Sequence, residues 1–105
     1  MFDELAEEIH KNAVDKGFWD RTADPIFLAK QMMMIVSEVS EAMEAVRKEM
    51  DPEQISDEFA DIIIRTLDLY AGMVEAGYVT KSIDYAIKEK MEKNSNRPQK
   101  HGVRF

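Results

Sequence analysis

Apolar residues recur every three or four positions along most of the chain, which is the spacing of one face of an α-helix. The chain has only 4 Gly and 3 Pro, and those between the periodic stretches mark helix ends. The pattern predicts an all-α fold without strands, and its short connections favour an antiparallel four-helix bundle-like protomer. We expect helices at about residues 3–16, 25–50, 53–76 and 81–96.

Local signals mark the predicted helix ends. Asp24 and Asp51 each precede a proline, the pattern of an N-cap followed by proline at the first helical position. Gly17 and Gly77 are expected to end the first and third helices, and Thr80 is expected to cap the fourth.

The second and third helices carry long apolar stripes, which we expect to face inward. On the second helix the stripe comprises Leu28, Met32, Ile35, Val36, Val39, Met43, Val46 and Met50. The third helix has a main face of Ile55, Phe59, Ile62, Ile63, Thr66, Leu69, Tyr70 and Met73, and a second face of Ala60, Ile64, Leu67, Ala71 and Val74. A helix that is apolar on two sides must be buried on both, so we predict a homodimer or homotetramer.

Length and composition narrow the function. With 105 residues the chain is predicted to be one domain, residues 1–105. It has no cysteine and 2 histidines, which excludes thiolate chemistry and leaves oxygen as the expected metal ligand. The net charge of −7 disfavours nucleic acid and anionic membranes as partners. We see neither a signal peptide nor a membrane-spanning apolar run, so we expect a cytoplasmic protein.

Positive charge is concentrated at the C-terminal end. Residues 1–87 have a net charge of −11, whereas residues 88–105 have a net charge of +4, and 98–105 are expected to form an irregular tail. This segment is either a solvated tail or a source of phosphate ligands. For the second interpretation the candidate residues are Lys90, Lys93, Asn94, Arg97, Lys100 and His101.

Two acidic pairs occur at helical spacing on neighbouring predicted helices. Glu38 and Glu41 lie three positions apart on the second helix, and Glu58 and Asp61 lie three apart on the third. Each pair shares a helix face, and antiparallel helices can bring both pairs to one point. Four clustered carboxylates repel one another unless a cation lies between them. Oxygen ligands without nitrogen suit Mg²⁺ or Mn²⁺, so we predict a site for one of these ions.

Other chemistries lack their residues. A di-iron carboxylate bundle needs Glu-x-x-His motifs, which His10 and His101 do not supply. The chain also has no nucleophile elbow, no P-loop and no Gly-x-Gly-x-x-Gly motif.

The stretch from Glu38 to Tyr70, EVSEAMEAVRKEMDPEQISDEFADIIIRTLDLY, resembles the MazG-like members of the all-α nucleoside triphosphate pyrophosphohydrolase superfamily. The signature of these proteins is Glu-x-x-Glu, a short linker and Glu-x-x-Asp. The resemblance extends to GFW at 17–19 and to KMEKNSNRPQKHG at 90–102. It implies that the four acids bind magnesium and that the enzyme cleaves a nucleoside triphosphate between the α and β phosphates, giving a monophosphate and pyrophosphate.

The resemblance also bears on substrate preference. The GFW segment and the C-terminal residues look most like members that act on deoxynucleoside triphosphates, which implies a role in cleaning the nucleotide pool. Ser37 and Ser40, however, stand where many members have Glu and Gly. A phosphoribosyl-ATP pyrophosphohydrolase of the same superfamily is an alternative, and a catalytically silent helical interaction module is another.

Several residues near the predicted acidic site have two interpretations. Trp19, in the loop after the first helix, either stacks on the base of the substrate or plugs the end of the bundle. Gln31 and Met34 are expected to line the same pocket, on the side of the helix that carries Glu38. Arg65 is expected to assist the acidic site or to pair with an acid on its own helix, and Asp68 is expected to be structural.

Overall fold

The computed structural model describes residues 1–19 and 22–97, and the regular structure within these ranges is entirely helical. The prediction of four helices and no strands is confirmed for this part of the chain. None of the helices in these ranges is both long enough and apolar enough to cross a membrane. The helices are α1 (Phe2–Asp15), α2 (Pro25–Arg47), α3 (Pro52–Glu75) and α4 (Ile83–Ser95).

The predicted caps of α2 and α3 are formed. Asp24 accepts a hydrogen bond from the backbone N–H of Phe27 at 2.7 Å, and Asp51 accepts one from Gln54 at 2.9 Å. Each satisfies a donor that the first helical turn leaves without a partner inside the helix. After α3, Gly77 adopts a φ of 83°, a left-handed conformation that ends the helix at little cost for glycine.

Two predicted helix ends were misplaced. The helix α2 ends at Arg47 rather than near Met50, and Glu49 beyond it has a φ of 55°. The last helix begins at Ile83 because Ser82, not Thr80, is its N-cap and accepts from the N–H of Tyr85 at 3.2 Å.

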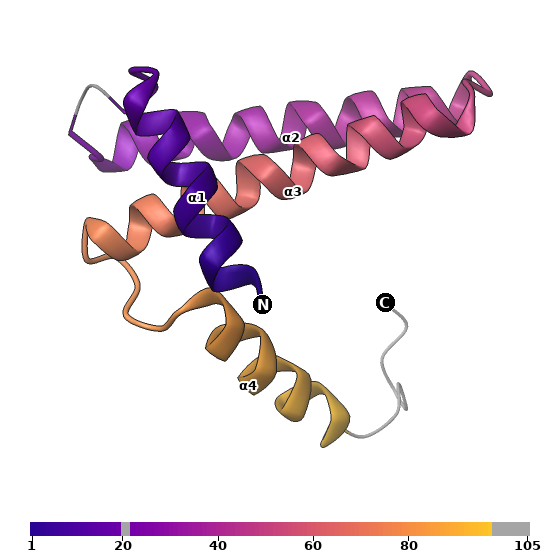
Figure 1. The fold of residues 1–105 in the computed structure, drawn as a ribbon. Helices are drawn as coiled ribbons and strands as arrows, with labels where there is room; N and C mark the ends of the chain where they lie inside the picture. Colours follow the sequence, from indigo (N-terminus) through magenta and orange to yellow (C-terminus); the bar gives the residue numbers. More distant parts are fainter. Residues whose placement is uncertain (20–21, 98–105) are drawn as a thin grey trace.

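The helices α2 and α3 pack against each other as a long antiparallel hairpin (Figure 1). Buried or half-buried positions alternate at three- and four-residue intervals along each helix, which is the spacing of a coiled-coil seam. The seam on α2 comprises Leu28, Gln31, Ile35, Glu38, Ala42 and Ala45, and that on α3 comprises Ile55, Glu58, Ile62, Arg65, Leu69 and Gly72. Polar side chains therefore interrupt an otherwise apolar interface, and three of the predicted site residues, Gln31, Glu38 and Glu58, are among them.

The helix α1 crosses α3 near the C-terminal end of α3, and polar contacts anchor it there. His10 is 7% exposed, and its ring nitrogens lie 2.8 Å from Asp68 Oδ1 and 2.8 Å from Glu75 Oε2. Asp68 also accepts from the indole N–H of Trp19, so it joins α1 and the loop after it to α3.

The helix α4 extends away from the hairpin (Figure 1). It contacts α1 and α3, and among the described residues it makes no contact with α2. Its N-terminus joins that of α1, because Asp84 accepts from the N–H groups of Phe2 and Asp3 while Asp3 accepts from the N–H of Asp84. The helices described here therefore do not close into the four-helix bundle that the short connections predict.

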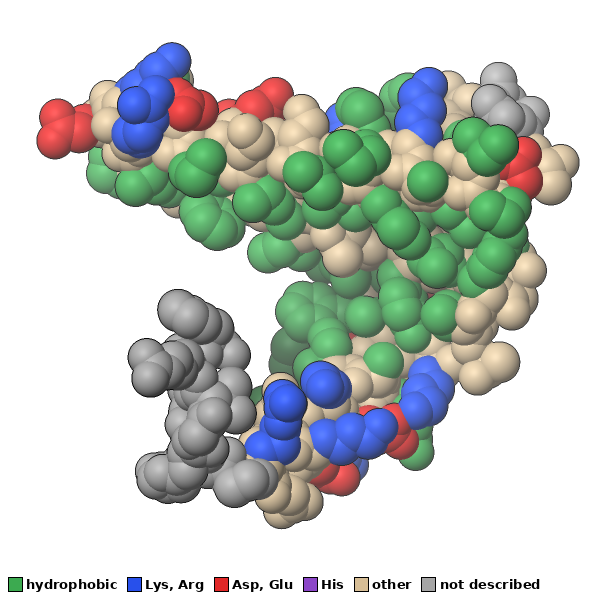
Figure 2. Space-filling view, turned by 180° about the vertical axis from the view of Figure 1, so that it is seen from behind, with side chains coloured by type: hydrophobic (Ala, Val, Ile, Leu, Met, Phe, Trp, Pro, Cys, Tyr) green, Lys and Arg blue, Asp and Glu red, His purple; other side chains and the backbone are tan. Residues whose placement is uncertain are grey.

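The apolar stripe expected to face inward on α2 is largely exposed. Met43 is 62% exposed and Phe59, on the adjoining face of α3, is 53% exposed. Figure 2 shows hydrophobic side chains gathered along the α2–α3 hairpin on the side that faces α4. The prediction was wrong for these positions because α3 packs on the side of α2 that carries Ala42 and Ala45, whose small side chains permit close approach. We call the exposed surface the apolar face; it comprises Val36, Val39, Met43, Val46, Phe59 and Ile63.

The second apolar face predicted on α3 is covered only in part. Leu67 is buried and Ala71 is half-buried beside α1. Ala60, Ile64 and Val74 are exposed. Within one chain the face is therefore covered at Leu67 and Ala71 and open at the other three positions.

Candidate functional site

Carboxylates from α2 and α3 converge at the hairpin interface. One oxygen from each of Glu38, Glu58 and Asp61 lies within 4.8 Å of the others. Glu38 and Glu58 occupy seam positions and are half-buried, whereas Asp61 is exposed. Ions such as Mg²⁺ and Ca²⁺ bind oxygens at about 2.0–2.6 Å, so oxygens this close can share one ion.

Glu58 is the most constrained member of the group. Its Oε2 atom is buried and has no hydrogen-bond partner among the described residues. Burial raises the pKa of Glu58, and the negative charges of Glu41, Glu38 and Asp61 raise it further. Buried polar atoms almost always have a partner, and a bound cation would supply one here. The donor set and this orphaned oxygen fit a hard divalent cation.

Glu41 is placed differently from the other three predicted acids. It is exposed and does not belong to the group of converging oxygens. Its charge nevertheless affects Glu58 more than that of Glu38 does, so it extends the negative field of the site. The spacing therefore identified one acidic region, of which the structure brings three carboxylates together.

Arg65 brings a positive charge to this acidic region. Its Nε atom donates to Glu38 Oε1 at 3.0 Å, across the interface between the two helices. Of the two interpretations offered for Arg65, the contact at the acidic site is therefore formed, rather than a pair along its own helix.

A cavity of about 640 Å³ adjoins the carboxylates, between α1, α2 and α3. Trp19, predicted to stack on the base, and Gln31 and Met34, predicted to line the pocket, all line it together with Asp61 and Arg65. Binding sites for small molecules typically have volumes of about 300–1,000 Å³, and the volume of this cavity falls within that range. The structure thus brings the predicted pocket residues and the acidic region to one place.

Trp19 packs at the junction of the helices and also lines the cavity. Its ring packs edge-on against His10 at 4.8 Å and Phe27 at 5.2 Å between centroids, which plugs the junction of the helices. It also forms a wall of the cavity. Because its N–H is donated to Asp68, the indole offers the cavity apolar ring surface rather than a hydrogen bond.

Two lysines at this cavity were missed by sequence reasoning. Lys16 and Lys30 line it, from the end of α1 and from α2 respectively. The signal for Lys30 was its spacing, since it precedes Met34 by four positions and Glu38 by eight on one helix. Lys16 follows α1 and had no such periodic signal.

The predicted phosphate ligands of the C-terminal region lie elsewhere. Lys90, Lys93, Asn94 and Arg97 are exposed, at α4 and just beyond it, and none of them lines the cavity beside the carboxylates. Lys93 lies 3.7 Å from Glu89 on its own helix. Lys100 and His101 fall outside the described residues. In the described part of one chain, the predicted phosphate ligands are therefore not brought to the candidate site.

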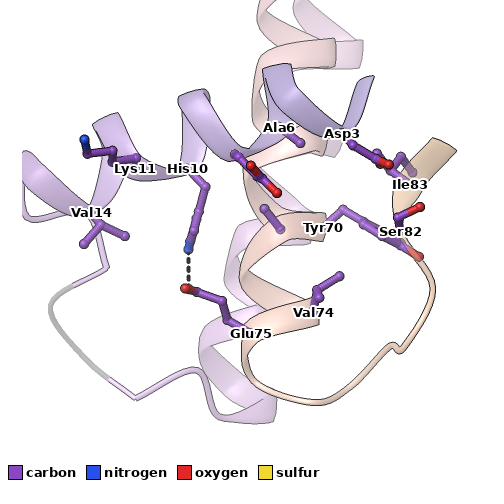
Figure 3. Close-up of a pocket in the computed structure, with 12 residues that line it drawn as sticks. Asp3, Ala6, His10, Lys11, Val14, Tyr70, Val74, Glu75, Ser82 and Ile83 are labelled. Atoms are coloured by element: carbon purple, nitrogen blue, oxygen red, sulfur yellow. Dashed lines mark hydrogen bonds and ion pairs between the residues drawn. The ribbon is translucent and has the colours of Figure 1, made fainter. Parts of the chain in front are cut away.

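A second cavity, of about 510 Å³, lies between α1, α3 and the start of α4 (Figure 3). His10 points into it and meets Glu75, while Val14 and Val74 lie on either side of this pair. None of the residues predicted to bind metal or substrate lines this cavity. The candidate site is therefore the cavity beside the carboxylates.

The fold and the site together define an all-α protein with an acidic cluster on a helical hairpin. The MazG nucleotide pyrophosphohydrolase domain matches residues 28–102, which is most of the chain. The chain therefore belongs to this family, and the matched region contains all four predicted acids. No curated protein and no solved structure gives a significant match to the chain.

Proposed function

We propose that this protein hydrolyses nucleoside triphosphates between the α and β phosphates in a Mg²⁺-dependent reaction. The observation that carries the proposal is the convergence of Glu38, Glu58 and Asp61 beside a cavity of about 640 Å³. Membership of the MazG nucleotide pyrophosphohydrolase family supports it. The products would be the nucleoside monophosphate and pyrophosphate.

The acidic residues would hold the ion and the water. In this proposal Glu38, Glu41, Glu58 and Asp61 are the ligands, with Mg²⁺ preferred and Mn²⁺ as the substitute. When bound, the ion would neutralise phosphate charge and lower the pKa of a bound water. A carboxylate that is not fully engaged as a ligand would accept the proton of the attacking water. Glu41 is our choice for this task because it is exposed and lies outside the converging group.

The cavity would receive the nucleoside. The ring of Trp19 offers an apolar surface to a base, and the half-buried Gln31 offers both a donor and an acceptor. The cations Lys16 and Lys30 line the same cavity and would attract phosphate oxygens.

A protein that removes deoxynucleoside triphosphates from the pool would act in the cytoplasm.

A comparison of variants tests this proposal. Glu41→Gln and Asp61→Asn should abolish pyrophosphate release while leaving the far-UV circular dichroism of the protein unchanged. Without metal, each should melt at the same temperature as the wild type or higher, because one of several like charges is removed. Arg47→Gln, which removes an exposed ion pair with Glu44 elsewhere on α2, is the control. Retained turnover in both acid variants would refute the proposal.

A substrate panel separates the remaining alternatives. Canonical and modified nucleoside triphosphates and phosphoribosyl-ATP would be compared by pyrophosphate release with Mg²⁺. Preference for phosphoribosyl-ATP would favour the second hydrolase reaction. If the protein instead releases no pyrophosphate and gains no thermal stability from millimolar Mg²⁺, it is a silent interaction module, because a ligand of the native state must stabilise it.

The C-terminal cations would contribute phosphate contacts from a second subunit. In this extension of the proposal, Arg97→Ala lowers kcat/KM by roughly ten- to a hundredfold, the effect of losing a hydrogen bond to a charged group. The melting temperature should not change, because Arg97 is exposed. Unchanged kinetics would mean that the region is a solvated tail.

The apolar face would be covered by a second copy of the chain, as a homodimer or as part of a homotetramer. It joins α2 and α3 into one exposed hydrophobic surface, which monomeric proteins rarely present (Figure 2). Light scattering at micromolar concentration should therefore give a mass above that of one chain. Met43→Glu should lower it, whereas Met91→Glu, the same change at a methionine of α4 that is 65% exposed, should not. A monomeric wild type would contradict this assembly.

A further inference from the structure

Arg65 is the positive charge that directly meets the converging carboxylates. Its Nε atom donates to Glu38 Oε1 at 3.0 Å. The side chain of Glu38 is only 13% exposed, whereas that of Arg65 is 40% exposed. The pair is therefore shielded from water on the carboxylate side and open on the guanidinium side, where Arg65 lines the cavity.

The ion pair between Arg65 and Glu38 offsets part of the repulsion among the converging carboxylates. Glu38 shares its surroundings with Glu58 and Asp61, one oxygen of each lying within 4.8 Å of the others. A half-buried carboxylate beside two others is costly without a counter-ion. Asp68, three positions after Arg65 on the same helix, is already engaged, because it accepts from both His10 and Trp19. Arg65 thus neutralises one of the two half-buried acids of the converging group.

We propose that Arg65 is the resident counter-ion of the acidic site, which holds Glu38 when no metal is bound and competes with the metal for this carboxylate. This inference rests on the proposed function, because it presupposes that the acids bind a divalent cation. Two consequences follow from electrostatics. Arg65 stabilises the metal-free protein, and its charge weakens the binding of a divalent ion to the same group of acids. Arg65 is in this sense a positioning residue that sets the Mg²⁺ concentration at which the site fills.

The test measures metal affinity and metal-free stability, without activity. Mg²⁺ is titrated into the full-length wild type, Arg65→Gln and Arg65→Lys by calorimetry, and each is melted with and without Mg²⁺. Arg65→Gln should bind Mg²⁺ about tenfold more tightly, an order-of-magnitude effect for removing one nearby positive charge in partly screened surroundings. Without metal, the same variant should melt at a lower temperature than the wild type. Arg65→Lys keeps the charge and should restore both properties toward the wild type.

Arg47→Gln is the matched control, since Arg47 pairs with Glu44 on the surface of α2, outside the converging acids. It should alter neither the Mg²⁺ affinity nor the melting temperature appreciably. If Arg65→Gln binds Mg²⁺ equally well or more weakly, the competition is refuted, while the metal site of the proposed function stands. If the wild type itself binds neither Mg²⁺ nor Mn²⁺, the metal site is refuted and this inference falls with it.

Discussion

Gly72→Ala probes the junction that places Trp19 beside the candidate site. Gly72 is buried in α3, and a Cβ atom there would lie 2.3 Å from Trp19 Cη2 and 2.8 Å from both Cζ2 and Cζ3. Ordinary contact begins at about 3.4 Å, so the indole would have to move by about 1 Å. The glycine is thus required by the close approach of a ring, not by its backbone conformation.

The expected magnitude combines opposing terms. Alanine in a helix interior is favoured over glycine by about 1 kcal/mol. Overpacking costs about 1–3 kcal/mol, and moving the indole weakens its hydrogen bonds to Asp68, which measure 3.0 and 3.1 Å. A hydrogen bond to a charged group contributes about 1.5–3 kcal/mol. We therefore expect Gly72→Ala to lower the free energy of unfolding by about 2–4 kcal/mol.

The assay is urea denaturation at fixed protein concentration, followed by far-UV circular dichroism and by fluorescence. Trp19 is the only tryptophan of the chain, so its emission reports directly on the displaced ring. A shifted emission in the folded variant, together with a lower urea midpoint at similar slope, would show local displacement with loss of stability.

The decisive comparison repeats the substitution in a Trp19→Leu background. Leucine lacks all three ring atoms that the new Cβ would meet, so there Gly72→Ala should stabilise by about 0.5–1 kcal/mol. The sign of the effect should therefore reverse between the two backgrounds. Equal destabilisation in both, or a neutral effect in the wild type, would refute the reasoning.

Three further predictions concern acidity and local conformation. Because burial and the charge of Glu41 raise the pKa of Glu58 above its ordinary value of 4.5, the folded protein resists ionisation of this group. The destabilising effect of ionised Glu58 on the folded state is absent below pH 4.5, and it grows as the pH rises through the folded pKa of this group. Glu58→Gln should therefore raise the metal-free melting temperature progressively above pH 4.5, and a gain independent of pH would contradict this. His10→Ala should lower the free energy of unfolding by about 2–3 kcal/mol in urea, whereas Glu75→Gln should cost less than about 1 kcal/mol because Glu75 is exposed. Equal costs would show that the exposed contact matters as much as the contact with Asp68. Glu49→Gly should stabilise by about 0.5–1 kcal/mol in the same assay, since φ at this position is 55°, and a loss of stability would contradict the assignment of strain there.

Features that depend on near neighbours along the chain could be predicted without the fold. The Asp-Pro pairs fixed where α2 and α3 begin, because a cap and its N–H donor are three residues apart. The acidic pairs were found for a similar reason: residues three apart share a helix face whatever the helix packs against. Spacing also placed Gln31 and Met34 on the side of α2 that carries Glu38, and all three lie at or beside the site.

The tertiary structure decided which faces are covered and which distant groups meet. Ala42 and Ala45 are buried against α3, whereas the residue that follows each of them, Met43 and Val46, is exposed, because small side chains permit close approach of two helices. The apolar pattern alone predicted that the stripe of larger apolar residues on α2 faces inward. The contacts of Arg65 with Glu38 and of Trp19 with Asp68 join residues 27 and 49 positions apart. Such pairs follow from the register and crossing of packed helices, which no local spacing encodes.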